Sequence, residues 1–243
     1  TKWIYYRAAA CVAALLFLAY LAFPLLVFAA KSRVSENKPR EETFKNIIEK
    51  SRNLTLQQDR TQSTQILINA LKKENRKSQA FAEMSAVLDE VSTVFYTEKA
   101  QQVYELALSS LENDLVISQS RLQEGLRLEP NNLVLLIQIS RTFIAANDCA
   151  QAQTFQQKAR DMNPWSTEVD LLAAQVALCL DQRDKYFAVK STLDPKVYSQ
   201  NIYWMNLEAE VMSRTGQLEI AKEHATTVTK LEPSFPEGYL LLY

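Results

Sequence analysis

Four prolines that follow apolar helical segments constrain this chain more than any other feature. They are Pro130 (RLEPNN), Pro164 (DMNPWS), Pro195 (TLDPKV) and Pro233 (KLEPSF). From Thr43 onward apolar residues recur at steps of three and four, which is typical of amphipathic helices, and no stretch alternates like a strand. A helical pattern that returns at a fixed period indicates stacked units of similar structure. The chain is therefore predicted to be all-α.

The interval from Pro130 to Pro164 matches the period of the tetratricopeptide repeat (TPR), about 34 residues, and the chain resembles this family. The family pattern places small residues twelve and five positions before each proline, where the two helices of a hairpin cross closely. These positions hold Ser118, Gly125, Ala152, Ala159, Ala221 and Val228, and all but the last are small. The resemblance covers roughly residues 106–243 and implies an α-solenoid of TPR-like helical hairpins.

Two parts of the chain depart from this pattern. The interval from Pro164 to Pro195 is shorter than the repeat period and the interval from Pro195 to Pro233 is longer, so the third unit is expected to be irregular. Within residues 43–105, Ser63 and Ala70 have the seven-residue spacing of a second helix, but no proline closes the unit. We expect divergent helical hairpins over 43–105.

An uncharged apolar run, Ala8–Ala30, precedes the helical part. Its 23 residues exceed the roughly 20 that a membrane-spanning helix needs, and Arg7 and Lys31 bracket it. We expect a single N-terminal transmembrane helix, with residues 1–30 as the anchor and 31–42 as a charged tether. A cleaved signal peptide is the alternative, although its apolar core usually has only about 7 to 15 residues.

Two cysteines bear on the compartment. Cys149 and Cys179 each lie fifteen residues from Pro164, so in two antiparallel helices folded about that turn they would face one another. They either form a disulfide, which indicates an oxidising compartment such as the bacterial periplasm, or pack as small buried hydrophobes.

The charges flanking the apolar run indicate a cytoplasmic domain instead of a periplasmic one. Lys31, Arg33, Lys38 and Arg40 follow the run and outnumber Lys2 and Arg7 before it, which favours a cytoplasmic domain. We expect a single-pass protein of the inner (cell) membrane with a periplasmic domain, and a cytoplasmic domain is the alternative.

Composition argues against several function classes. Only three glycines occur, far apart, so no glycine-rich loop is available for a nucleotide. The single histidine, His224, is expected on a helix surface, and three scattered cysteines do not complete a metal site. Lys plus Arg, 27, balance Asp plus Glu, 28, which argues against nucleic-acid binding. We therefore expect no cofactor, no metal, no small-molecule substrate and no enzymatic activity.

The TPR resemblance implies protein–protein interaction. We expect a membrane-anchored TPR scaffold or accessory protein in the assembly or operation of a bacterial envelope complex, with the other proteins of that complex as partners. The inner helices of the hairpins would form the binding groove. The candidate partner-binding residues are Gln138, Arg141, Gln175, Tyr203 and Asn206. The alternatives are the C-terminal TPR tail of a membrane polysaccharide ligase or polymerase, and a cytoplasm-facing TPR adaptor.

Overall fold

The computed structural model describes residues 43–111, 113–193, 201–239 and 242. The expected anchor (1–30) and tether (31–42) lie outside these residues, and no described helix is long and apolar enough to cross a membrane. Every regular element in the described ranges is helical. The elements are a helix over 43–56, α2 (Arg60–Leu71), α3 (Gln79–Thr93), α4 (Glu98–Leu108), α5 (Leu115–Leu128), α6 (Leu133–Ala145), α7 (Cys149–Met162), α8 (Thr167–Cys179), α9 (Arg183–Ser191), α11 (Ile202–Arg214), α12 (Leu218–Leu231) and the 3₁₀ turn η1 (Pro236–Gly238).

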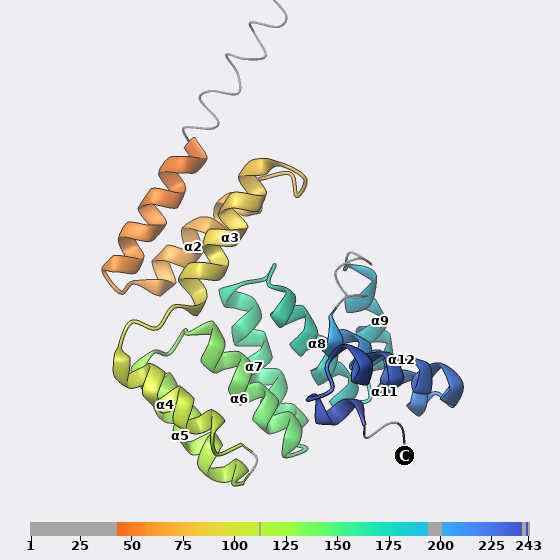
Figure 1. Ribbon diagram of the computed structural model, residues 1–243. Coiled ribbons are helices and arrows are strands. Elements are labelled where there is room, and N and C mark those ends of the chain that lie inside the picture. Colours follow the sequence, from red (N-terminus) through yellow and green to blue (C-terminus); the bar gives the residue numbers. More distant parts are fainter. Residues whose placement is uncertain (1–42, 112, 194–200, 240–241, 243) are drawn as a thin grey trace, which may run out of the picture.

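Consecutive helices pair into hairpins, as Figure 1 shows: α4 with α5, α6 with α7, α8 with α9, and α11 with α12. The small positions taken from the TPR pattern are all buried in these hairpins. A Cβ atom added at Gly125 would lie 3.0 Å from Leu135 Cδ2, so α5 approaches α6 too closely for a larger side chain. The prediction of an all-α solenoid with TPR-type hairpins is confirmed.

Local sequence signals fix the ends of the helices. Asp148 caps α7, because its Oδ1 accepts a hydrogen bond from the Gln151 N–H at 3.1 Å. Gly216 ends the turn after α11 at φ +78°, in the left-handed region where a Cβ is unfavourable. These caps satisfy backbone groups that each helix end leaves without an intrahelical partner.

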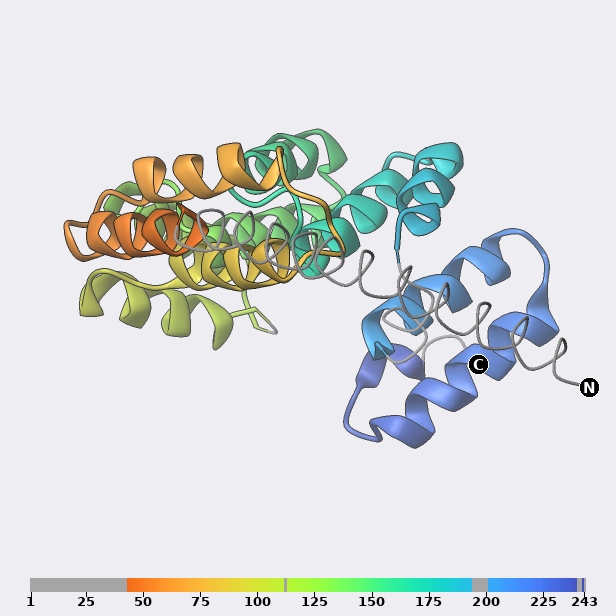
Figure 2. The ribbon, with the colours of Figure 1, turned by 90° about the horizontal axis from the view of Figure 1, so that it is seen from above.

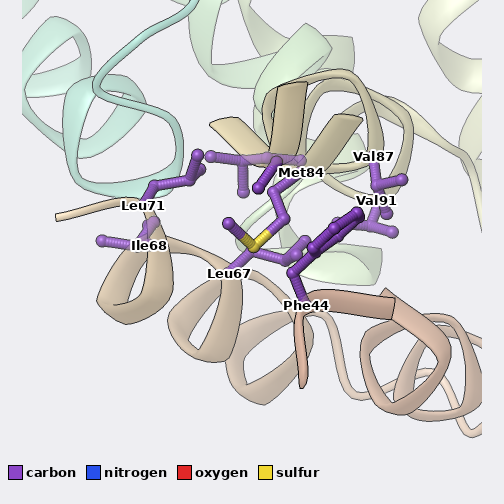
Figure 3. Close-up of a cluster of buried hydrophobic side chains, with 9 residues drawn as sticks. Phe44, Leu67, Ile68, Leu71, Met84, Val87 and Val91 are labelled. Atoms are coloured by element: carbon purple, nitrogen blue, oxygen red, sulfur yellow. The ribbon is translucent and has the colours of Figure 1, made fainter. Parts of the chain in front are cut away.

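The helix over 43–56 forms a separate unit with α2 and α3. Ser51 Oγ and Ser63 Oγ lie 2.8 Å apart where the first two helices cross, the same place that small residues take in the later hairpins. Figure 3 shows the core of this N-terminal unit, which buries Phe44, Leu71 and Met84. The limit predicted between the divergent hairpins (43–105) and the TPR-like repeats (106–243) falls inside α4, because the hairpin of α4 and α5 already begins at Glu98.

This N-terminal unit does not stack on the α4–α5 hairpin that follows it in sequence. Instead, α3 contacts α6 and α2 contacts α7, so the unit lies over the turns that end α5 and α7 (Figure 1). Phe81 packs edge-on against Trp165, with ring centroids 5.9 Å apart. Asn163 Nδ2 donates to Asp89 Oδ1 at 2.6 Å.

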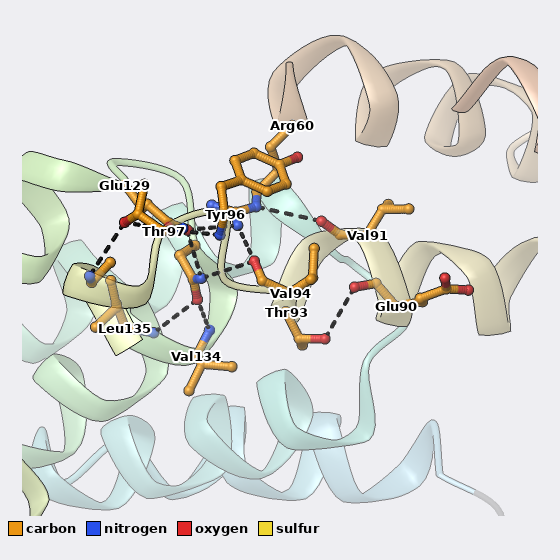
Figure 4. A network of polar contacts seen from close by, with 12 residues as sticks. Arg60, Glu90, Val91, Thr93, Val94, Tyr96, Thr97, Glu129, Val134 and Leu135 are labelled. Atoms are coloured by element: carbon orange, nitrogen blue, oxygen red, sulfur yellow. Dashed lines mark hydrogen bonds and ion pairs between the residues drawn. The ribbon is translucent and has the colours of Figure 1, made fainter. Parts of the chain in front are cut away.

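A buried ion pair holds the same junction (Figure 4). The Arg60 guanidinium donates to Glu129 Oε2 at 2.9 Å, and both side chains are at most 5% exposed. Glu129 Oε1 also accepts the backbone N–H groups of Tyr96 and Thr97, at 2.8 and 3.0 Å. Burial acts to raise the pKa of Glu129, but the hydrogen bonds from Arg60, Asn132, Thr97 and Tyr96 outweigh it and hold the pKa below its ordinary value.

The C-terminal hairpin is set off from the rest of the stack, as Figure 2 shows. The third unit is irregular: α9 has only nine residues, and residues 194–200 lie outside the described part. The joint with α11 is apolar, because Trp204, 2% exposed, packs with Leu171 and Leu178 of α8. Arg214 of α11 donates to the Leu178 carbonyl oxygen at 3.3 Å.

Candidate partner-binding groove

A groove of about 580 Å³ runs along α6, α8 and α11, the first helices of three successive hairpins. The five residues proposed from the sequence all line it: Gln138 and Arg141 from α6, Gln175 from α8, and Tyr203 and Asn206 from α11. Whether they bind a partner stays a prediction. The structure does bring them together on one surface.

The groove has an apolar floor and an aromatic corner. Ile144, Leu178 and Leu207 contribute apolar surface from the three helices. The Tyr203 ring stands edge-on to Phe235, with centroids 5.4 Å apart, and Tyr203 remains 49% exposed. A large aromatic side chain that is half exposed in a groove is typical of interaction surfaces, because it adds contact area at a small entropic cost.

Two residues that line this groove have a side-chain amide oxygen without a donor. Gln175 Oε1 and Asn206 Oδ1 are buried atoms that have no hydrogen-bond partner among the described residues. A buried acceptor without a partner costs about 1–3 kcal/mol, and a ligand in the groove reaches these two oxygens only when the side chains rotate toward it. A rotated Gln175 or Asn206 amide can both donate and accept, so the pair favours a ligand with polar groups.

The cations of the groove are already paired. Arg141 forms an ion pair of 2.7 Å with Glu168, and Arg214 is paired with Glu210 one helical turn earlier. Because each guanidinium has a carboxylate beside it, the groove offers little net charge to a ligand. A strongly acidic or basic ligand would gain little from it.

A disulfide joins Cys149 to Cys179, with their Cα atoms 5.6 Å apart. It links the first residue of α7 to the last residue of α8, and Cys179 and Asn147 line the groove. The bond therefore fixes two neighbouring hairpins to each other at the rim of the groove.

Sequence reasoning missed several residues of the groove. Glu210 and Arg214 follow Asn206 at steps of four on the same face of α11, so helical periodicity could have found them. Phe235 follows the last helix in an irregular segment, and no periodic signal places it.

The described residues contain no candidate metal site. No group of three His, Cys, Asp or Glu side chains in these ranges could hold a metal ion. His224 is half-buried on α12 and does not line the groove.

Comparison with known proteins returns helical-repeat structures. A tetratricopeptide repeat protein from Parabacteroides merdae is 13% identical, with a TM-score of 0.44 over 83% of this chain and 98% of the other. Pseudomonas aeruginosa pilF is 16% identical, with a TM-score of 0.39 over 83% of this chain and 97% of the other. Both TM-scores are below 0.5, so the fold assignment depends on the hairpins described above. No protein-family model and no curated protein matches the chain.

Proposed function

We propose that this chain is a membrane-anchored TPR scaffold or accessory protein, without catalytic activity of its own, that serves a bacterial envelope complex. Its groove along α6, α8 and α11 binds a polypeptide segment of another protein of that complex. The observation that carries the proposal is one groove lined from three successive hairpins, in which Tyr203 stays 49% exposed beside Phe235.

The groove chemistry fits an uncharged peptide segment. An apolar or aromatic side chain of such a segment would pack beside Tyr203 and Phe235, and its main chain would hydrogen-bond to the Gln175 and Asn206 amides once these rotate toward the groove. The paired state of Arg141 and Arg214 favours a segment without a large net charge. Small-molecule binding is less well supported, since the groove is an open surface shared by three helices.

Two observations support the proposed location. The run Ala8–Ala30 has the length and composition of a membrane span, and this supports an anchor. The Cys149–Cys179 bond supports a domain in an oxidising compartment, which for an inner-membrane protein is the periplasm. The charge flanking the run favours the cytoplasm, and we give the disulfide more weight because positive-inside counts here differ by only two residues.

Site-specific photo-crosslinking in cells tests the groove. A photoreactive amino acid replaces Tyr203, which is exposed in the groove, and crosslinked partners are identified by mass spectrometry. Adducts are expected when the crosslinker at position 203 is the only change. They should be lost when Gln175→Leu and Asn206→Leu are added, because both side-chain amides are then removed.

Gln123→Leu, on the exposed face of α5 and outside the groove, is the matched control. It should leave the adducts unchanged. Identical adducts in the double variant and the control would refute the groove as the binding site, and both variants are checked by circular dichroism for an unchanged fold.

A further inference from the structure

The turn between α2 and α3 is strongly basic. It reads KKENRK and holds four cations, Lys72, Lys73, Arg76 and Lys77, against one acid, Glu74. All four cationic residues are exposed, and none forms a salt bridge to a described residue. Asn75 Oδ1 accepts the Lys77 N–H at 2.9 Å, so the turn has an ordered backbone.

This basic turn lies beside the point where the described chain begins. The helix over 43–56 runs antiparallel to α2, because Ser51 meets Ser63 at their crossing. From that crossing, the first helix runs back to residue 43 while α2 runs forward to Leu71, so the start of the first helix lies opposite the end of α2. Phe44 and Leu71 accordingly belong to the same core. Figure 1 shows the start of the first helix and the α2–α3 turn at the same end of the N-terminal unit.

The next step depends on the proposed membrane anchor. If residues 8–30 span the bilayer, the tether of residues 31–42 is all that separates the membrane from residue 43. Twelve residues reach at most about 40 Å when fully extended. The first described helix therefore starts no more than about 40 Å from the end of the proposed span, and the basic turn lies at that same end of the N-terminal unit.

We propose that the α2–α3 turn is a membrane-contact surface that binds anionic phospholipid headgroups. Their phosphates complement the four cations, and tethering keeps the turn at a high local concentration at the bilayer. At an ionic strength of about 0.15 M, the attraction between opposite charges is screened beyond about 8 Å. The turn is therefore attracted to the headgroups only when it lies next to them. This contact orients the N-terminal unit on the membrane and, through its junction with α6 and α7, also the groove.

Fluorescence quenching on the full chain in vesicles tests this surface. Gln79→Cys, exposed beside the turn, carries a fluorophore in a Cys11→Ser background, and the disulfide keeps Cys149 and Cys179 unreactive. The vesicles contain headgroup-spin-labelled lipid in either phosphatidylcholine or phosphatidylcholine with about 30 mol% phosphatidylglycerol. Quenching should be at least about twofold stronger in the anionic vesicles and should fall when salt is raised to about 1 M.

Charge removal in the turn provides the decisive comparison. Replacing Lys72, Lys73, Arg76 and Lys77 with Gln should abolish the extra quenching. Four exposed cations elsewhere serve as the matched control and should leave it intact when replaced with Gln: Arg127, Lys185, Lys222 and Lys230.

Several results would overturn the proposed membrane contact of the α2–α3 turn. Equal quenching in neutral and anionic vesicles overturns the membrane contact, as does a turn variant that behaves like the parent. Loss of the effect with millimolar inorganic phosphate at constant ionic strength would assign the turn to free phosphate rather than to lipid. A chain that alkaline carbonate releases from the vesicles refutes the anchor and with it this inference, whereas the crosslinking test of the groove is independent of that result.

Discussion

Removing the disulfide gives the most direct quantitative test of the structure. Cys149→Ser and Cys179→Ser together delete a bond between positions with a sequence separation of 30. In the chain-entropy model, closing a loop of this length restricts the unfolded chain enough to stabilise the fold by about 3.6 kcal/mol. We expect the double variant to lose about this free energy of unfolding, with measured losses for native disulfides spanning about 2–5 kcal/mol.

Urea unfolding of the oxidised parent chain and of the double variant, followed by far-UV circular dichroism, measures the difference. Because the bond acts on the unfolded chain, hydrogen exchange should show lower protection of the slowest-exchanging amides throughout the core, those of α7 and α8 included. Reducing the parent with dithiothreitol should reproduce the variant, and Cys11→Ser is the control that leaves the pair intact.

Two results would contradict this reasoning. A loss below about 1 kcal/mol would show that closing this loop contributes much less than chain entropy requires. Free thiols at both positions in unreduced protein would show that the bond is not formed, and the support for a periplasmic domain would disappear with it.

Three further predictions concern the fold. Glu129→Gln should destabilise the protein by about 3 kcal/mol, because the Arg60 charge stays buried without its partner. Because the pKa of Glu129 is lowered in the folded chain, the ionised carboxylate stabilises the fold at pH values above 4.5, the ordinary pKa of a glutamate. This stabilisation is lost as pH falls through the folded-state pKa. Urea unfolding between about pH 6 and 3 should therefore show a steeper loss of stability in the parent than in this variant. Gly125→Val should cost about 1–3 kcal/mol in thermal unfolding, since even its Cβ would meet Leu135 at 3.0 Å, and an unchanged melting temperature would refute the close approach of α5 and α6. Gly216→Ala should cost about 1 kcal/mol at φ +78°, and a stabilised variant would contradict that backbone conformation.

The hairpin architecture follows from the sequence because close helix crossing leaves a local, periodic signal. Small residues must stand where two helices approach, as at Ala152 and Ala159, and a proline or cap marks where each hairpin ends. The groove positions follow for a similar reason. Gln138, Arg141 and Gln175 lie on the inner faces of first helices, and a repeat fold turns those faces to the same side.

The placement of the N-terminal unit has no such signal. It depends on single polar and aromatic pairs, such as Arg60 with Glu129 and Asp89 with Asn163, that are 69 and 74 residues apart. No local propensity or period encodes a contact at that separation. A buried glutamate directly before Pro130 looks in sequence like an ordinary exposed residue at the end of a helix, since only its distant partner makes burial favourable.

The Arg60–Glu129 junction also changes how the molecule should fold and unfold. In a simple solenoid each repeat contacts only its neighbours, so unfolding can start at either end and spread unit by unit. Here the N-terminal unit contacts the end of α5 through Arg60 and Glu129 and also contacts α6 and α7, which closes residues 43–165 into a ring of contacts. We expect that ring to unfold as one cooperative block, while α11 and α12, which join the preceding units through α8, open separately. Its formation waits for distant segments to meet, so this half of the chain folds more slowly than a linear array of the same length.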